Sequence, residues 1–480
     1  MNPDVVVVGA GSAGSVLASR LSQRPDRSVL LLEAGPDFGS AAAGQPPAVA
    51  DAYDIGGTDY DWGYRGEPGV LGRKLRLYAG RLVGGSSAVG NVMALRGQAA
   101  DYDGWAAAGN RGWSYAEVLP AFRRLERDLD YPGDWHGDQG PIPVSRYRED
   151  RLHQAQRAFV EAAGAAGHLL VADHNAPEAV GAGRLPVNEL AGVRLSAALT
   201  HLAAARGRPN LTVRAGGTVA ELLVQDGRVF GVRLAGSGEE IHAGLVVVAA
   251  GAYGSPALLL RSGIGPAGQL TALGVPVHAD RPGVGQGLQE HPLLGLEFAC
   301  RDRPRADRRL HETLLTARSA AGPGPADLQL FPAGPAGGVL RLLVALLRPY
   351  SRGELRLDPA DPWAPPLIDP GLLRHPGDLP RLREGVALAR QLATTAPLAD
   401  HLDGSPAPVV RELVVPYQHP VGTCRMGPAT DPYAVVDPTG RVHEFEGLVI
   451  CDASIMPVIP SANTHLPTSM VAERCAEWLG

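Results

Sequence analysis

Residues 4–33 read DVVVVGAGSAGSVLASRLSQRPDRSVLLLE. The apolar runs at residues 4–8 and 29–32 predict two buried strands, because short β-branched runs beside turn residues are typical of such strands. Three glycines at GxGxxG spacing follow the first run: Gly9, Gly11 and Gly14. Apolar residues at helical spacing come next, and the second run ends in Glu33. This order of strand, glycine turn, helix, strand and acid is typical of a dinucleotide-binding unit.

Each part of this unit has a physical task. Gly9 permits a tight turn, Gly11 lets the backbone approach a pyrophosphate, and Gly14 lets the helix pack close to the strand. The helix N-terminus offers backbone N–H groups and the positive end of its dipole to phosphates. Glu33 can accept hydrogen bonds from ribose hydroxyls. The unit predicts a nucleotide site, and these residues alone leave both NAD and FAD open.

The composition limits the class of protein. The chain has 480 residues, which is long for one hydrophobic core and predicts two domains. A hydrophobic content of 45%, a charged content of 20% and a formal net charge of −6 fit a soluble globular protein and favour neither nucleic acid nor anionic membranes as partners. The most apolar stretch, residues 245–260, is too short and too interrupted by glycine and proline to span a bilayer.

The location and the cysteines can also be predicted. The first expected strand begins so early that it leaves no room for a signal peptide, so we expect a cytoplasmic protein. The four cysteines are dispersed without a CxxC pair, and we expect buried free thiols and no metal site.

Apolar patterns predict the further elements. Helical patterns are present at residues 105–130, 257–261 and 379–393, and the alanine-rich residues 151–205 are expected to be mostly helical, with a loop around residues 173–186. Short strands are predicted at residues 211–213, 219–224, 229–234, 245–248 and 352–357. The Asp226-Gly227 step predicts a hairpin within a small meander. Residues 293–349 show no clear pattern.

Four later stretches hold glycine or polar residues in apolar surroundings. They read GRLVGGSS at 80–87, GAYGSPALLLRSGIG at 251–265 with PGVGQGLQEHP after it, HPVGTCRMG at 419–427 and DASIMPVIPSANTH at 452–465. Together with the first unit, and in this order, they resemble the glucose–methanol–choline (GMC) oxidoreductases, which are FAD-dependent alcohol oxidases and dehydrogenases. The resemblance covers essentially the whole chain.

The resemblance implies an α/β fold made of two domains. A Rossmann-like FAD-binding domain is expected at residues 1–150, 206–292 and 435–480. An α+β substrate-binding domain, built on an antiparallel sheet with helices, is expected at residues 151–205 and 293–434. The chain is shorter than most relatives, with residues missing between Cys300 and Pro349.

The resemblance also assigns residues to FAD. The glycine turn and Glu33 would hold the ADP half, Val219 would meet the adenine, and the loop at residues 84–93 would run along the flavin. The residues implied are Gly9, Gly11, Ser12, Ala13, Gly14, Glu33, Ala34, Val83, Gly84, Ser86, Asn91, Val92, Met93, Val219, Ala250, Gly251, Asp452, Ala453, Thr464 and His465.

Two positions near the flavin depart from the family pattern. Val89 stands where some relatives carry a flavin-linking histidine, so FAD is expected to bind noncovalently. Gly90 occupies the place of the usual asparagine, and Asn91 follows it.

The resemblance further implies a catalytic pair. Moving a hydride from an alcohol to the flavin requires that the hydroxyl proton leaves as well, and a neutral imidazole with a pKa near the working pH is a suitable acceptor. His419 stands at the family position of that base. Asn463 stands at the second catalytic position, where an amide can orient the alcohol oxygen. His465 is expected to lie behind the flavin.

The leading hypothesis is oxidation of a primary or secondary alcohol, with hydride transfer to flavin N5 and with O2 or another electron acceptor. Alternatives are a mycofactocin-linked dehydrogenase with a dedicated acceptor, a hydroxynitrile-lyase-like use of the same site, and a noncatalytic FAD-binding protein. The alcohol substrate and the oligomeric state remain open.

Overall fold

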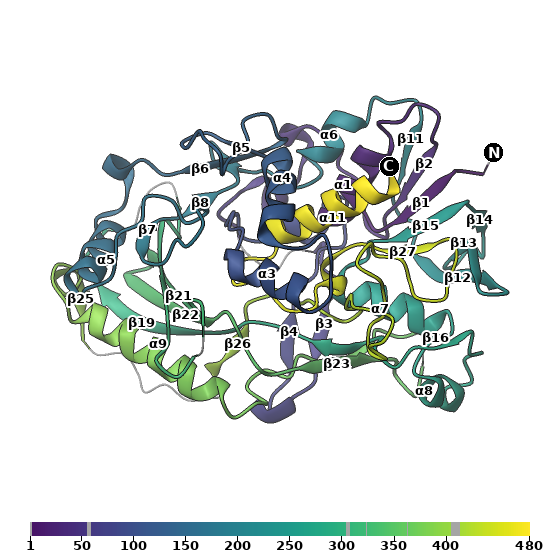
Figure 1. Cartoon of the computed structure of the whole chain (residues 1–480). Coiled ribbons are helices and arrows are strands. Elements are labelled where there is room, and N and C mark those ends of the chain that lie inside the picture. Colours follow the sequence, from purple (N-terminus) through teal and green to yellow (C-terminus); the bar gives the residue numbers. More distant parts are fainter. Residues whose placement is uncertain (1, 55–58, 304–307, 323, 362, 405–412) are drawn as a thin grey trace.

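The computed structural model describes residues 2–54, 59–303, 308–322, 324–361, 363–404 and 413–480. A parallel sheet and an antiparallel sheet lie at opposite ends of the molecule (Figure 1). Helices α1 (Ser12–Leu21) and α11 (His465–Leu479) lie beside the first sheet, and α9 (Asp378–Ala393) lies beside the second. The α/β class and the two-part architecture are confirmed.

The parallel sheet has five strands in the order β11-β2-β1-β15-β27. They are β11 (Leu211–Arg214), β2 (Val29–Leu32), β1 (Val5–Val8), β15 (Leu245–Val248) and β27 (Leu448–Ile450). Every neighbouring pair is parallel. The strands read as unbroken apolar runs because a parallel sheet is covered on both faces. The strands predicted at residues 4–8, 29–32 and 245–248 are therefore confirmed.

The meander is also present, but it starts one strand later than the sequence indicated. It comprises β12 (Val219–Gln225), β13 (Arg228–Leu234) and β14 (Glu240–His242), whereas β11 belongs to the parallel sheet. The predicted hairpin turn is correct, since both Asp226 (φ 49°) and Gly227 (φ 74°) have the positive φ of a type I′ turn.

The glycine turn between β1 and α1 is sterically demanding. Gly9 has a φ of +98°, which favours glycine. A Cβ added to Gly14 would lie 1.8 Å from the carbonyl oxygen of Gly9. Only glycine at position 14 therefore lets α1 begin so close to the end of β1.

The antiparallel sheet forms where the sequence showed no pattern. Its strands run in the order β25-β19-β22-β21-β20-β7, and β26 pairs with β19. They are β25 (Leu402–Asp403), β19 (Pro292–Cys300), β22 (Val339–Leu346), β21 (Leu328–Ala336), β20 (Thr313–Ala317), β7 (Ala182–Arg184) and β26 (Val415–Pro416). The expectation of an antiparallel sheet is confirmed, but the interpretation of residues 293–349 as patternless is wrong.

The two faces of this sheet have different neighbours. One face packs against α9 and α5 (Gln154–Ala165), and a Cβ on Gly385 of α9 would lie 2.6 Å from Val344. The opposite face carries Leu293, Phe331 and Leu343, which line a large cavity. The alternation of period two that separates these faces is present in the sequence.

Two helix predictions need correction. Residues 105–130 form the end of α3 (Ala99–Ala107), then α4 (Tyr115–Leu125) and β5 (Glu126–Asp128). The two helices are separated by Gly109 (φ 95°) and Gly112 (φ 89°), whose positive φ values are incompatible with a right-handed helix.

Residues 151–205 are helical only in α5 and α6 (His201–Ala205). Between these helices lie β7, β8 (Pro186–Val187), β9 (Glu189–Leu190) and β10 (Val193–Arg194). β7 lies within the loop expected at residues 173–186 and pairs with β20, whereas β8, β9 and β10 replace part of the expected helix. The helix predicted at residues 257–261 is longer, α7 (Gly251–Arg261).

A mixed sheet connects distant parts of the chain. Its order is β18-β23-β24-β3-β4, with β18 (Gln286–Leu288), β23 (Gly353–Arg356), β24 (Leu367–Asp369), β3 (Tyr64–Gly66) and β4 (Leu75–Leu77). The strand predicted at residues 352–357 is confirmed as β23. The remaining elements are α2 (Pro47–Ala50), β6 (Ile142–Arg146), β16 (Ile264–Gly265), α8 (Ala267–Ala272), β17 (Ala279–Asp280) and α10 (Leu398–His401).

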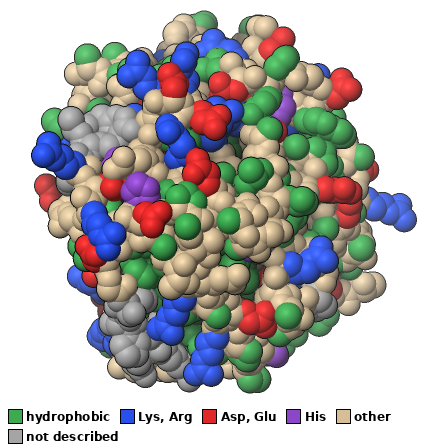
Figure 2. Space-filling view, turned by 90° about the vertical axis from the view of Figure 1, so that its left-hand side faces the viewer, with side chains coloured by type: hydrophobic (Ala, Val, Ile, Leu, Met, Phe, Trp, Pro, Cys, Tyr) green, Lys and Arg blue, Asp and Glu red, His purple; other side chains and the backbone are tan. Residues whose placement is uncertain are grey.

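The surface mixes positive and negative side chains, as Figure 2 shows for the face at the left of Figure 1. Within the described part of the chain, none of the helices has the length and apolar character needed to cross a bilayer. All four cysteines are free; Cys424, Cys451 and Cys475 are buried as expected, and Cys300 is half-buried. The cytoplasmic location remains a prediction.

Buried Arg194 holds the loop that carries the two departures from the family pattern. Its guanidinium donates to the carbonyl oxygens of Gly90 (2.9 Å), Ala88 (3.1 Å) and Val49 (2.6 Å). Burial lowers the pKa of Arg194 to about 10, so it stays charged at neutral pH. The positions of Val89 and Gly90 therefore depend on a buried cation.

We predict that Arg194→Leu lowers the midpoint of urea unfolding strongly. Each buried carbonyl left without a donor costs about 1–3 kcal/mol, so the free energy of unfolding should fall by more than about 3 kcal/mol. Arg148→Leu is the matched control, because the Arg148 side chain is 80% exposed. Equal midpoints for the two variants would show that the loop is held by other contacts.

Candidate active site

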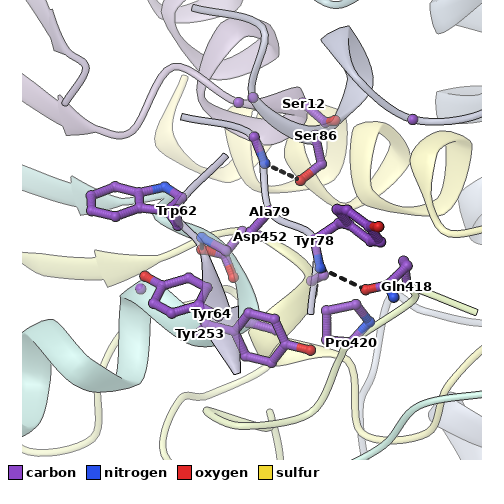
Figure 3. A pocket seen from close by; sticks show the side chains of 18 of the residues that line it. Ser12, Trp62, Tyr64, Tyr78, Ala79, Ser86, Tyr253, Gln418, Pro420 and Asp452 are labelled. Atoms are coloured by element: carbon purple, nitrogen blue, oxygen red, sulfur yellow. Dashed lines mark hydrogen bonds between the residues drawn. The ribbon is translucent and has the colours of Figure 1, made fainter. Parts of the chain in front are cut away.

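A cavity of about 890 Å³ lies where the three sheets meet. The ends of β1 and β2 and the starts of α1, α7 and α11 form one part of its wall. Leu293, Phe331 and Leu343 of the antiparallel sheet form another part. Figure 3 shows Tyr64 and Tyr253 beside one another in this cavity, with ring centroids 5.5 Å apart. The crevice lies at the carboxyl ends of the parallel strands, the usual ligand position in such sheets.

The glycine-turn end of the cavity suits an anion. Both α1 and α11 begin there, so the positive ends of two helix dipoles face the same space. Ser12 Oγ lies 3.1 Å from His465 Nδ1 and joins the two helix starts. A Cβ on Gly85 would lie 2.6 Å from Gly11 Cα, so the two backbones form a narrow cradle without side chains. These features fit the pyrophosphate of a dinucleotide.

Glu33 is buried at the edge of this cradle. Its carboxylate accepts hydrogen bonds from the backbone N–H groups of Ala10 (2.9 Å) and Gly35 (2.9 Å). Burial raises the pKa of Glu33, and the N–H groups of Gly35 and Ala10 act against this rise. Each oxygen keeps a second lone pair. Glu33 can therefore hold the turn and still accept a hydrogen bond from a hydroxyl group of a ligand.

Asp452 joins two segments of the wall. Its Oδ2 accepts from the backbone N–H of Gly251 (2.8 Å) and from Ser255 Oγ (2.5 Å), and its Oδ1 accepts from the N–H of Ser454 (2.7 Å). Burial raises the pKa of Asp452, and the hydroxyl of Ser255 is the main group that opposes the rise. The carboxylate thus connects the start of α7 to the turn that contains Ala453.

His419 and Asn463 meet at the cavity wall. The Nδ2 of Asn463 lies 3.2 Å from the Nε2 of His419, and both side chains are buried. The ring of Tyr417 packs on the ring of His419 with centroids 4.2 Å apart. Tyr417 in turn stacks on Phe331 at 5.6 Å with an interplanar angle of 15°. The sequence-predicted catalytic pair is therefore together, beside an aromatic wall.

The backbone at His419 is held firmly. The carboxyl group of Glu290 accepts the N–H of His419 at 2.8 and 2.9 Å and the N–H of His291 at 2.8 Å. Burial raises the pKa of Glu290 to about 8, against the effect of these N–H groups. Gln418 has a φ of 70°, a strained value for a side-chain-bearing residue, and its Oε1 accepts from the N–H of Tyr78 at 2.9 Å (Figure 3). Tertiary contacts on both sides thus fix the position of His419.

The histidines of the site are neutral at neutral pH. Burial, with a smaller contribution from His291, lowers the pKa of His419 well below 6.5. Burial also lowers the pKa of His465 to about 4. The pKa of His419 therefore lies further from neutrality than the sequence-based expectation of a value near the working pH. An unprotonated imidazole is the state that a base requires.

Most of the residues implied for the site line the cavity. They are Gly9, Gly11, Ser12, Ala13, Glu33, Ala34, Ser86, Asn91, Met93, Val219, Ala250, Gly251, His419, Asp452, Ala453, Asn463, Thr464 and His465. Gly14, Val83, Gly84 and Val92 are not part of the lining. They support the wall from behind, as the N–H of Gly84 does by donating to the carbonyl of Ala10 (2.8 Å).

Sequence reasoning missed the aromatic wall and the residues behind His419. Tyr417 stands two positions before His419, but Gln418 between them has a φ of 70°, so this segment is not an extended strand and its spacing gave no signal for Tyr417. Phe331 comes from the segment without a recognised pattern. Glu290 and His291 lie in the QEHP stretch, to which no role had been given.

Comparisons with known proteins agree with this geometry. Residues 3–293 and 349–472 match two family models, each described as GMC oxidoreductase. The chain is 39% identical to a 5-(hydroxymethyl)furfural oxidase from Methylovorus sp. (strain MP688), covering 99% of this chain and 98% of that protein. It is 33% identical to an oxygen-dependent choline dehydrogenase from Brucella suis biovar 1 (strain 1330), covering 99% of this chain and 95% of that protein.

A solved structure gives the same result. The fold matches the crystal structure of pyridoxine 4-oxidase from Mesorbium loti with a TM-score of 0.92 and 34% identity, covering 99% of each chain. The cradle of backbone N–H groups at the glycine turn fits the FAD that this family binds. The chain belongs to the GMC oxidoreductase family and is an FAD-dependent oxidoreductase.

Proposed function

We propose that this protein oxidises an alcohol to the carbonyl compound with His419 as the general base, and that a primary alcohol on a small aromatic ring is its preferred substrate. The observation that carries the proposal is the contact of 3.2 Å between His419 Nε2 and Asn463 Nδ2 at the cavity wall. An acceptor and a donor side by side are what an alcohol hydroxyl needs, because it donates a proton and accepts a hydrogen bond.

The cofactor would be held at the opposite part of the cavity. The glycine turn and the starts of α1 and α11 would bind the pyrophosphate, and Glu33 would bind a ribose hydroxyl. Val89 at the possible attachment point supports noncovalent binding. Bound FAD supplies the hydride acceptor at its N5 atom.

Two protein side chains take part in the transfer of the hydroxyl proton. Neutral His419 takes the hydroxyl proton at Nε2, and Asn463 Nδ2 donates to the alcohol oxygen as negative charge develops there. The backbone hydrogen bonds to Glu290 keep the imidazole in place during the transfer. Burial of both side chains limits the access of water.

The aromatic wall supports the choice of substrate. Tyr417 and Phe331 are nearly parallel, and Leu293 and Leu343 extend the apolar surface. Such a surface suits a flat apolar ring, since aromatic rings stack offset on one another. The names of two relatives, a 5-(hydroxymethyl)furfural oxidase and a pyridoxine 4-oxidase, also point to alcohols on aromatic rings.

An anaerobic panel of alcohols tests the proposal. Hydroxymethylfuran and benzyl alcohols should bleach the flavin absorbance faster than aliphatic alcohols and choline at equal concentration. Admission of O2 should then restore the colour if oxygen is the acceptor; slow recovery would favour a dedicated acceptor such as mycofactocin. Hydroxynitrile cleavage without bleaching would favour a lyase, and no bleaching by any alcohol would contradict the proposal.

We predict that Glu33→Ala weakens FAD binding. The carboxylate should lose one or two charge-assisted hydrogen bonds to the cofactor, worth about 1.5–3 kcal/mol each, which raises the Kd at least about tenfold. Titration of the apoprotein with FAD, followed by flavin fluorescence, measures this change. Glu239→Ala is the control, because Glu239 is exposed and pairs with Arg214. An unchanged Kd for Glu33→Ala would mean that the ribose is held elsewhere.

We predict that His419→Ala retains FAD and slows flavin reduction by about 10²–10⁴-fold, whereas Asn463→Ala costs less because the base remains. A base acts only when unprotonated, and the pKa of His419 is lowered well below 6.5. The wild-type rate should therefore fall only at pH values well below 6.5 and stay level from there to neutral pH.

Stopped-flow reduction across this pH range measures both effects. His419→Ala should lose the acid limb of the profile. If His465→Ala loses that limb while His419→Ala keeps it, the two assignments are reversed.

A further inference from the structure

His291 lies directly behind the base. Its Nδ1 is 3.0 Å from His419 Nδ1, and its Nε2 is 3.0 Å from the carbonyl oxygen of Leu347. The two imidazole planes are almost perpendicular, at 88°. Both rings are buried, so water does not compete for these hydrogen bonds.

The hydrogen of each ring nitrogen can be assigned from these contacts. A carbonyl oxygen only accepts, so Nε2 of His291 carries a hydrogen. Burial lowers the pKa of His291 to about 3, although hydrogen bonds to the carbonyl groups of Leu347 and Pro460 act to raise it. The ring is therefore neutral and has only one N–H. Its Nδ1 is therefore an acceptor. The contact of 3.0 Å then requires that Nδ1 of His419 donates.

The contact on the opposite side of His419 agrees with this arrangement. A neutral His419 with hydrogen on Nδ1 has a lone pair on Nε2. Asn463 presents its donor Nδ2 to that atom at 3.2 Å. Asn463 Oδ1 has no hydrogen-bond partner among the residues that the structure describes. The relay from Leu347 through His291 and His419 to Asn463 is therefore consistent in its donors and acceptors.

We propose that His291 is a positioning residue that fixes the tautomer of His419, with hydrogen on Nδ1, so that the bare Nε2 faces the cavity. This proposal rests on the proposed role of His419 as the base. The other tautomer would place N–H toward Asn463, whose amide could turn its unpartnered Oδ1 to accept it. That form of His419 has no lone pair for the hydroxyl proton.

Two substitutions separate this role from simple packing. His291→Phe keeps a ring but offers neither acceptor nor donor, whereas His291→Gln offers an amide oxygen to His419 and an N–H to Leu347. We expect His291→Phe to lower the rate constant of flavin reduction about 10–100-fold with FAD retained, by analogy with groups that orient other functional imidazoles. His291→Gln should recover most of that loss. If His291 acted only by packing, His291→Phe should reduce its flavin faster than His291→Gln, since phenylalanine preserves the ring shape better.

The matched control is His174→Phe. His174 is also buried, but it lies against Thr316 Oγ1 (3.5 Å) and outside the large cavity. This variant should reduce its flavin at the wild-type rate. A similar loss in His174→Phe and His291→Phe would attribute the effect to general destabilisation and overturn the proposal.

The tautomer itself can be read by nitrogen NMR on FAD-loaded protein with labelled histidine and without substrate. Resonances of His419 are those lost in His419→Gln. In the wild type at neutral pH they should show a protonated Nδ1 and an unprotonated Nε2, and in His291→Phe the population should shift toward protonated Nε2. A protonated Nε2 in the wild type, or no shift in His291→Phe, overturns the proposal. Because this measurement needs no alcohol oxidation, its result is separate from the fate of the proposed function.

Discussion

The structure depends on a close approach between two stretches of backbone at Gly11 and Gly85. A side chain at Gly85 would collide with the Cα of Gly11. Because nothing separates them, the loop at residues 80–91 lies directly on the start of α1, and the two segments form one cradle. The carbonyl of Ala10 accepts the N–H of Gly84 at 2.8 Å and closes the contact. This approach forms the glycine-turn end of the cavity.

The proposed catalytic groups join the two parts of the fold. His291 immediately precedes β19, and Leu347 directly follows β22, so the relay behind the proposed base is anchored in the antiparallel sheet. Asn463 stands two residues before α11, which packs on α1 beside the parallel sheet. The contact between His419 and Asn463 therefore spans both parts. A small shift between the sheets would alter the distance on which the proposed proton transfer depends.

The sequence predicted the parts that local rules determine. The parallel strands were visible because they are continuous apolar runs, and the glycine turn because its spacing is local. The antiparallel sheet was missed, since Pro332, Gly334 and Pro335 interrupt β21 and since its pairing is long-range. The alanine content of residues 151–205 led to more predicted helix than α5 and α6 provide. His419 and Asn463 were found through motif resemblance, whereas Phe331 had no local signal and His291 acquires its meaning only from the contact with His419.

The strand order of the parallel sheet has a consequence for how the protein folds. Strand β1 comes from residues 5–8, while its sheet is completed by β27 at residues 448–450 and covered by α11 at residues 465–479. During synthesis, β1, β2, β11 and β15 can pair with one another, but the apolar edge of β15 stays exposed until β27 has been made. Completion of the sheet is therefore expected late in synthesis, since β15 pairs with β27 over a long stretch of intervening chain. The yield of active protein should then depend on chaperones that shield apolar strands and on the supply of the cofactor after release.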